Sequence, residues 1–231
     1  MHNITQTENK KVYFVSDPHL GHKQEFIWGS RGYTSPEHHT NSVIDGINAR
    51  VRSTDILCML GDFSLNTTID DFNDYISRIT CQNVCMLWGN HNNPHEKRVY
   101  KPLADALLDN SVIFKTEHYQ VYPVFYKNVK YLGHYHEVAI DGQIIIMFHY
   151  PISVWNFMGG GAWCLCGHSH YNFEPSTATN YNAKILDVWW DGFKKPLSFD
   201  EVSNIMAKKG IPQVDHHTSR TKFLDKLEET K

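Results

Sequence analysis

Polar residues that can bind metal ions follow five apolar stretches of this sequence, each at the point where the stretch ends. Seven of them offer oxygen or imidazole donors: Asp17, His19, Asp62, Asn90, His149, His168 and His170. The chain also has 15 histidines among 231 residues, and histidine is the commonest metal ligand in proteins. One such residue could simply be hydrogen-bonded to a buried neighbour, but seven in five clusters point to a metal site.

The number and type of these donors indicate what the site would bind. Seven side chains exceed what one ion usually takes, whereas two ions that share a bridging carboxylate would use them all. Mixed oxygen and imidazole donors suit manganese, iron, zinc, cobalt or nickel, while magnesium and calcium prefer oxygen alone. A pair of such ions activates water and clamps a transferring phosphoryl group, so the donor set predicts phosphoryl chemistry.

Alternating strands and helices are expected to bring the clusters together. The first half of the chain predicts strands 12–16, 56–60 and 84–88, followed in turn by helices 42–52, 69–79 and 94–108. The second half predicts strands 112–116, 119–126, 131–140, 143–147, 163–166 and 184–189. Asp141-Gly142 predicts a hairpin turn, and Ser198 with Glu201 predicts the capped start of a last helix. In such α/β sheets, side chains beyond the carboxyl ends of the strands converge on one crevice.

Composition places the chain among ordinary globular proteins. Hydrophobic residues make up 41% of it, and 22 basic against 25 acidic residues give a net charge of −3, so no global field attracts nucleic acid. We expect one domain over residues 1–231, with loose tails at 1–10 and 213–231 and without a signal peptide or membrane anchor. The five cysteines form no CxxC pair and predict reduced thiols in a cytoplasmic protein.

The order of the clusters resembles that of the calcineurin-like metallophosphoesterases. The series D-x-H, G-D, G-N-H, H-Y-P and G-H-x-H occurs here in that order, and the likeness extends over residues 12–199. Residues 16–22, which read S-D-P-H-L-G-H, are similar to the opening motif of the small bacterial and phage-type members. Each motif is weak alone, but five in this order are a specific signal.

The resemblance implies a fold and a ligand set. The fold would be α/β: a four-layer αββα sandwich of two mixed β-sheets flanked by helices, with the metals at the apex between the sheets. The implied ligands are Asp17, His19 and His170 for the first ion and Asn90, His149 and His168 for the second, with Asp62 as the bridge. His91 would be the catalytic residue, and His22 and Asn92 are candidates for substrate contact.

The implied activity is hydrolysis of a phosphate ester by in-line attack of a metal-bridging hydroxide, with two divalent ions as cofactor. Manganese is the first expectation, with iron, zinc, nickel and cobalt as alternatives. The expected substrate is a phosphodiester of a nucleotide or a nucleic-acid end. Two alternatives stay open: a phosphomonoesterase acting on a small metabolite or nucleotide, and a catalytically silent interaction module. A mononuclear iron oxygenase is disfavoured because it would leave four ligands unused.

Two departures from the family pattern modify this expectation. Asn92 stands where members usually carry an acidic residue, so we expect His91 to be a weaker acid or to use another carboxylate. Gly61-Asp62 does not continue into the D-R-G of the serine/threonine phosphatases, which argues against a phosphoprotein substrate. Among the remaining histidines, His22 could face the phosphate or support the site, while His38 and His39 are expected to be solvated.

Overall fold

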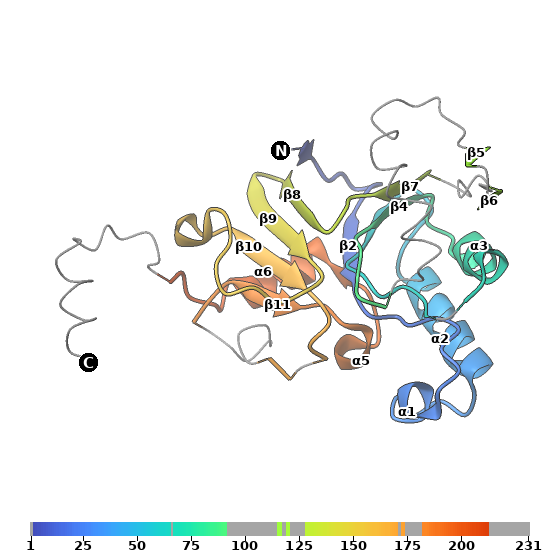
Figure 1. The fold of residues 1–231 in the computed structure, drawn as a ribbon. Coiled ribbons are helices and arrows are strands. Elements are labelled where there is room, and N and C mark those ends of the chain that lie inside the picture. The colour runs from blue at the N-terminus through green and yellow to red at the C-terminus, as the bar shows by residue number, and fades with distance from the viewer. Residues whose placement is uncertain are drawn as a thin grey trace, which may run out of the picture.

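Two mixed β-sheets form the frame of the molecule (Figure 1). The computed structural model describes residues 2–65, 67–91, 115–116, 119–120, 128–170, 172–173 and 182–212. The first sheet has the order β12 (Leu197–Ser198), β2 (Val12–Val15), β3 (Ile56–Met59), β4 (Asn83–Met86) and β7 (Asn128–Tyr131). The second has the order β1 (His2–Ile4), β8 (Tyr135–Ile140), β9 (Gln143–Phe148), β10 (Trp163–Cys166) and β11 (Ile185–Asp187).

Most strand pairs in these sheets are parallel. Only β12 with β2 and β8 with β9 run antiparallel within them, and the short strands β5 (Lys115–Thr116) and β6 (Tyr119–Gln120) pair separately. The β8–β9 hairpin turns at Asp141-Gly142, where both residues have positive φ, 48° and 84°. This is the backbone of the predicted hairpin turn.

Alternating side chains of the strands build a core on each face of the first sheet. On β3, Ile56 and Cys58 point toward the second sheet, while Leu57 and Met59 point toward the helices. The layer between the sheets also includes apolar residues of β8 to β11 and of helix α6 (Phe199–Met206). Because side chains alternate along each strand, these strands present one apolar face to the layer that packs the two sheets together.

Helices α2 (Pro36–Asn48) and α3 (Ile69–Arg78) cover the outer face of the first sheet (Figure 1). Ser35 caps α2, and Thr68 forms a capping box with Asp71 at the start of α3. The short helices α1 (Glu25–Trp28) and α5 (Trp190–Phe193) lie in the loops after β2 and β11. On the outer face of the second sheet, Trp155 and Met158 pack against β9 to β11. Met158 is the first residue of the 3-10 turn η1 (Met158–Gly160).

The structure differs from the sequence expectation at three places. The predicted strand 131–140 is two strands, because β7 ends at Tyr131 in the first sheet and β8 begins at Tyr135 in the second, with Gly133 at positive φ between them. The chain start is not entirely loose, since β1 pairs in parallel with Val138–Ile140 of β8. The helix expected at 42–52 begins earlier, at Pro36. The predicted helix 94–108, most of strands 112–116 and 119–126, and the tail 213–231 lie outside the described residues.

The chain is thus an α/β protein with two mixed sheets flanked by helices. All five cysteines are free thiols, in agreement with the expectation of reduced cysteines. Within the described residues, every helix is too short or too polar to cross a membrane.

Candidate metal centre

Five strands of the two sheets end in loops that carry the predicted donors. In the first sheet, the loop after β2 carries Asp17 and His19, the loop after β3 carries Asp62, and the loop after β4 carries Asn90. In the second sheet, the loop after β9 carries His149, and the loop after β10 carries His168 and His170. Backbone hydrogen bonds tie these loops together within each sheet, from Asp17 N to Gly61 O (3.2 Å) and from Gly167 N to His149 O (2.9 Å). Ser16 Oγ joins the sheets by donating to Cys166 O at 3.4 Å.

The donor loops hold much of the unusual backbone of the molecule. Eight non-glycine residues of the described chain have positive φ, and five of them are predicted ligands: Asp17, His19, Asp62, His168 and His170, with φ between 44° and 68°. The left-handed region costs a non-glycine residue of the order of 1 kcal/mol. Such backbone strain clusters at functional sites, where it turns a side chain toward the centre instead of along the strand.

Three glycines in these loops let the backbone approach the donors closely. A Cβ atom at Gly89 would overlap the carboxylate and backbone nitrogen of Asp62, and one at Gly61 would overlap the His149 ring. A Cβ at Gly167 would overlap Asp17 and Ser16. The G-D, G-N-H and G-H-x-H motifs therefore need their glycines for space against the donor side chains.

The first group of converging donors consists of Asp17, His19 and His170. Asp17 Oδ1 lies 3.7 Å from His19 Nε2 and 3.5 Å from His170 Nε2, and the two imidazole rings stack at 5.5 Å between centroids. One ligand atom from each residue lies within 4.8 Å of the others, so that the three can share one ion. Asp17 and His19 are buried, and His170 is half-buried.

The second group shares Asp17 and adds Asp62 and His149, again within 4.8 Å of one another. Asp62 Oδ2 lies 3.5 Å from His149 Nε2 and 3.9 Å from His19 Nε2, so it faces a residue of each group. Asp62 Oδ1 accepts the backbone N–H of His91 at 2.8 Å. A carboxylate with one oxygen between two groups is suited to bridge a pair of ions.

The surroundings of His149 favour a cation at its Nε2. Its Nδ1 lies 2.8 Å from the Leu60 carbonyl, which can only accept, so Nδ1 must carry a proton. Nε2 lies 2.9 Å from Asn90 Oδ1 and 3.5 Å from Asp62 Oδ2, which are both acceptors. Only a proton or a metal ion between them makes this arrangement favourable, and accordingly the pKa of His149 is raised in spite of its burial.

Buried donor atoms without hydrogen-bond partners provide a test of whether these residues fit a metal. Within the described part of the chain, Asp17 Oδ1 and both ring nitrogens of His19 have no hydrogen-bond partner, although all three atoms are buried. A buried polar group without a partner costs about 1–3 kcal/mol. Bound cations would satisfy Asp17 Oδ1 and one nitrogen of His19, so the residues fit the expected ions.

The charges of the site favour cations in general. Burial alone would raise the pKa of Asp17, but the nearby imidazoles of His170, His149 and His19 hold it well below its usual range. Burial also lowers the pKa of His170, yet Asp17 and Asp191 outweigh it and raise that pKa to about 10. Burial lowers the pKa of His19 to about 3, so its ring stays neutral and available as a ligand. Protons and metal ions therefore compete for this centre.

The other predicted residues lie around the two groups. His168 is exposed, its ring centroid lies 5.2 Å from that of His149, and its backbone N–H donates to Asp17 Oδ2 at 2.9 Å. His91 is exposed, with its ring centroid 5.7 Å from that of His19. His22 is buried behind the site, 6.1 Å from the His19 ring, and its Nδ1 accepts the Gln24 N–H. Asn92 lies outside the described residues.

A buried network of side-chain contacts supports the loop after β2, and no sequence motif had indicated it. Arg31 donates to the carbonyls of Pro18 (3.0 Å) and Asp17 (3.1 Å), and its Nε lies 2.8 Å from Asp191 Oδ1. Asp191 Oδ2 faces His170 Nδ1 at 3.4 Å. This arrangement orients His170 from behind, as carboxylates commonly do for metal-binding histidines.

His39 is also part of this network. Contrary to the expectation that it is solvated, His39 is fully buried in α2, 2.9 Å from Arg31 Nη1, while His38 is exposed as predicted. The i, i+4 apolar stripe of α2 offers the one sequence signal, since His39 precedes Val43 by four residues and so shares its buried face. Arg31 and Asp191 carry no such signal.

Comparison with known proteins gives a fold neighbour and nothing on activity. The chain matches no known family profile, and it matches no curated protein. It is similar to the crystal structure of a protein of unknown function from Aquifex aeolicus, with a TM-score of 0.57 and 18% sequence identity. The alignment covers 85% of this chain and 100% of that one. At this identity the likeness shows a shared α/β fold alone.

Proposed function

We propose that the protein is a dinuclear-metal phosphoesterase whose fold is the αββα sandwich of the metallophosphoesterases. The observation that carries the proposal is the pair of donor groups that share Asp17. They are built from the ends of β2, β3, β9 and β10 and contain buried donor atoms without hydrogen-bond partners among the described residues. A structural cluster of hydrogen-bonded side chains would instead satisfy these atoms among themselves.

The charges of the donors support an anionic substrate. Two divalent ions, when bound, supply a water activated for attack and positive charge opposite the phosphate oxygens. Asp17 and Asp62 contribute two negative charges, whereas Asn90 and the imidazoles are neutral ligands. The residues therefore leave part of the charge of two divalent ions uncompensated, which favours a phosphate at the centre.

His91 is the residue best placed to act on the leaving group. Its backbone N–H is fixed by Asp62 Oδ1, while its side chain is exposed beside the first donor group. An imidazole in this position can donate a proton to the departing oxygen or stabilise its charge, a contribution of about 10²–10⁴-fold. The proposed ligands His168 and Asn90 lie next to His149, a member of the second donor group.

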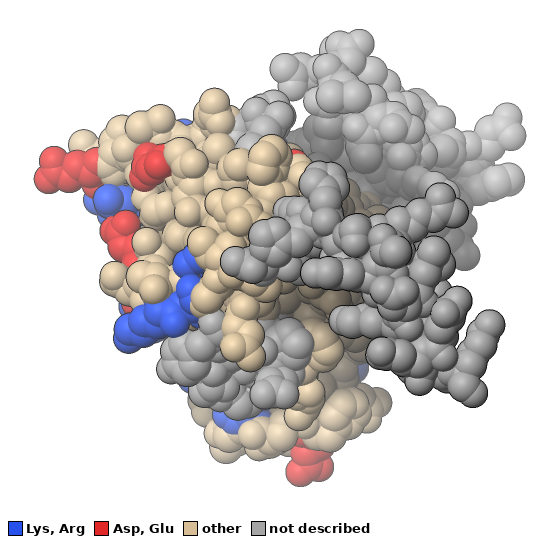
Figure 2. All heavy atoms as spheres, turned by 90° about the vertical axis from the view of Figure 1, so that its left-hand side faces the viewer, with Lys and Arg blue, Asp and Glu red and all other residues tan. Residues whose placement is uncertain are grey.

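A small phosphodiester, such as a nucleotide or a nucleic-acid end, is the substrate class we propose. On the face drawn in Figure 2, basic and acidic side chains of the described residues are scattered among neutral ones. A net charge of −3 likewise gives no overall attraction for a long polyanion. Recognition would then depend on the metal centre itself and not on tracking along nucleic acid.

The test uses chelator-treated protein to which manganese is returned. We expect hydrolysis of bis-p-nitrophenyl phosphate, slower hydrolysis of p-nitrophenyl phosphate, and a loss of at least about 100-fold in Asp17→Asn because a charged ligand is removed. Asp45→Asn, which changes an exposed carboxyl on α2, is the matched control and should keep full activity.

Three results would contradict the proposal in different ways. Faster hydrolysis of the monoester would favour a phosphomonoesterase over a phosphodiesterase. Uptake of manganese without hydrolysis of either ester would indicate a silent module. Failure of the folded protein to bind manganese, zinc, iron or nickel would overturn the metal centre itself.

A further inference from the structure

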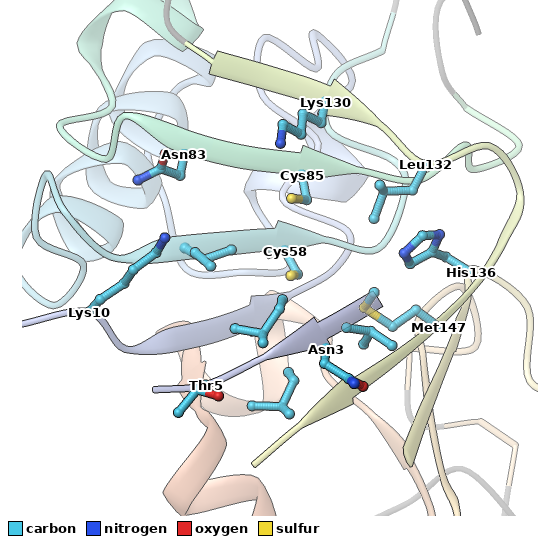
Figure 3. Close-up of a pocket in the computed structure, with 14 residues that line it drawn as sticks. Asn3, Thr5, Lys10, Cys58, Asn83, Cys85, Lys130, Leu132, His136 and Met147 are labelled. Carbon is cyan, nitrogen blue, oxygen red and sulfur yellow. The ribbon is translucent and has the colours of Figure 1, made fainter. Parts of the chain in front are cut away.

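A cavity of about 450 Å³ opens between the two sheets, away from the donor loops (Figure 3). Its lining comes from both sheets and from the chain before β2. Its described lining includes none of the seven proposed donors, and Cys58 on its wall lies in β3, before the loop that carries Asp62. The fully buried Leu60 lies between them in sequence. The cavity is therefore separate from the metal centre and independent of the function proposed for it.

The wall of the cavity is apolar at its floor and basic at its mouth. Cys58, Ile140 and Met147 are almost completely buried at the floor, whereas Lys10 and Lys130 are exposed and reach toward the same space in Figure 3. Among the lining residues that the structure describes, none carries a carboxylate. Ion pairs among the described residues include neither lysine, so both ammonium groups are available to a ligand.

The charge of Lys130 acts on a thiol in the wall of the cavity. A hydrogen bond from Cys58 and the charge of Lys130 hold the pKa of the Cys85 thiol below its usual value, in spite of burial. This local excess of positive charge stands out in a chain whose net charge is −3.

We propose that this cavity binds a small amphipathic anion, an aliphatic chain of medium length with one carboxylate. The chain would lie on the apolar floor formed by Ile140 and Met147, and the carboxylate would lie at the mouth between Lys10 and Lys130. A volume of about 450 Å³ falls in the usual range of small-molecule sites, which combine an apolar lining with a few polar groups.

The first test is calorimetric titration of the full chain with sodium decanoate below its micellar concentration. We expect saturable 1:1 binding, which Lys10→Gln and Lys130→Gln each weaken by about two- to fivefold, as for an exposed ion pair. Lys208→Gln, an exposed lysine at the end of α6, should leave the affinity unchanged. Decanol has the same aliphatic chain without the charge. Its affinity for the parent protein should not exceed the affinity of decanoate for the double variant Lys10→Gln/Lys130→Gln.

The second test reads occupancy directly at the cavity wall. Decanoate should slow the alkylation of Cys85 by iodoacetamide, followed by peptide mass spectrometry, and should do so less in the double lysine variant. Absence of saturable binding, equal affinities for decanoate and decanol, or no protection of Cys85 would each overturn the proposal. Because both lysines are exposed, loss of folding does not confuse these results, and manganese binding serves as an independent check of the metal centre.

Discussion

At the scale of single residues, Asp17 and His19 are buried without enough partners for their polar atoms. Burying such groups is unfavourable unless a hydrogen bond or a cation compensates. His149 shows the same deficit in another form, because its Nε2 faces two oxygen acceptors. These buried polar atoms therefore reduce the free energy of unfolding, and binding of a cation to them would increase it.

Asp191 should act on metal affinity through His170, without being a ligand. Asp191→Ala removes the acceptor behind His170 Nδ1 and the partner of Arg31 Nε. Since comparable supporting residues contribute about 10- to 100-fold to metal affinity, we expect a loss of that size in manganese titrations. Asp45→Ala is the control. An unchanged affinity in a folded Asp191→Ala protein would show that this contact does not position His170.

His39 should make the stability of the metal-free protein depend on pH. Burial first, then the charge of Arg31, lowers its pKa to about 3 in the folded state, against 6.5 for a free histidine. The unfolded chain therefore binds more protons, and the contribution to stability is lost as the pH falls from about 6.5 toward 3. At pH 5 this loss amounts to about 2 kcal/mol.

Urea unfolding in the presence of a chelator, at pH 7.5 and pH 5, measures this effect. His39→Gln should reduce the difference in unfolding free energy between the two pH values by about 2 kcal/mol. The exposed His38→Gln is the matched control and should keep the parental difference. A difference that is the same in all three proteins would contradict the assigned protonation of His39.

At the scale of elements, the site is made by the ends of strands. Parallel neighbours β2, β3 and β4 present their carboxyl ends along one edge, and β9 and β10 do the same in the second sheet. The left-handed residues that follow turn the chain sharply, so that side chains separated by up to 153 positions meet. The glycines in these turns provide the space that the donors need.

Gly89→Ala tests the role of close approach at the end of β4. Its Cβ would overlap both the carboxylate and the backbone nitrogen of Asp62. We expect a loss of about 1–3 kcal/mol in stability from overpacking, together with weakened manganese binding, because Asp62 must move. Gly160→Ala, where the new Cβ meets only the Phe157 ring at an ordinary 3.8 Å, is the control. Equal behaviour of the two variants in urea and manganese titrations would argue against this account.

At the scale of the whole molecule, the proposed metal centre lies where the two sheets meet, and elsewhere they pack through an apolar layer. Asp17 and Asp62 follow strands of the first sheet, while His149 and His170 follow strands of the second. Ions shared by these residues would link the two halves of the sandwich. Metal binding should therefore stabilise the complete fold and not one loop alone.

Thermal unfolding with and without manganese measures this coupling. At a concentration 100-fold above its Kd, each bound ion adds about 2.7 kcal/mol. For a chain of this size, each bound ion should raise Tm by about 5–10 °C, and chelator should reverse the shift. Asp62→Asn should lose most of the shift, whereas Asp45→Asn should keep it. A Tm that does not respond to manganese in the parent would contradict the coupling.

The sequence determined which side chains could serve as donors and where each lies along the chain. Apolar runs such as residues 12–15 and 56–59 are local patterns, and so are the glycine and histidine motifs that end them, so strand positions and candidate ligands follow from neighbouring residues alone. The Thr68 and Ser198 caps and the Asp141-Gly142 turn are local for the same reason.

The tertiary structure decided which of those donors share a centre and what stands behind them. Asp17 belongs to both donor groups, whereas Asp62, the expected bridge, belongs to the second group. This depends on how the loop after β2 lies against both sheets. The division of residues 131–140 between two sheets, the pairing of β1 and the burial of Arg31 and His39 depend equally on distant partners. Strand pairing and burial are set by long-range packing, which the periodicity of a single segment does not encode.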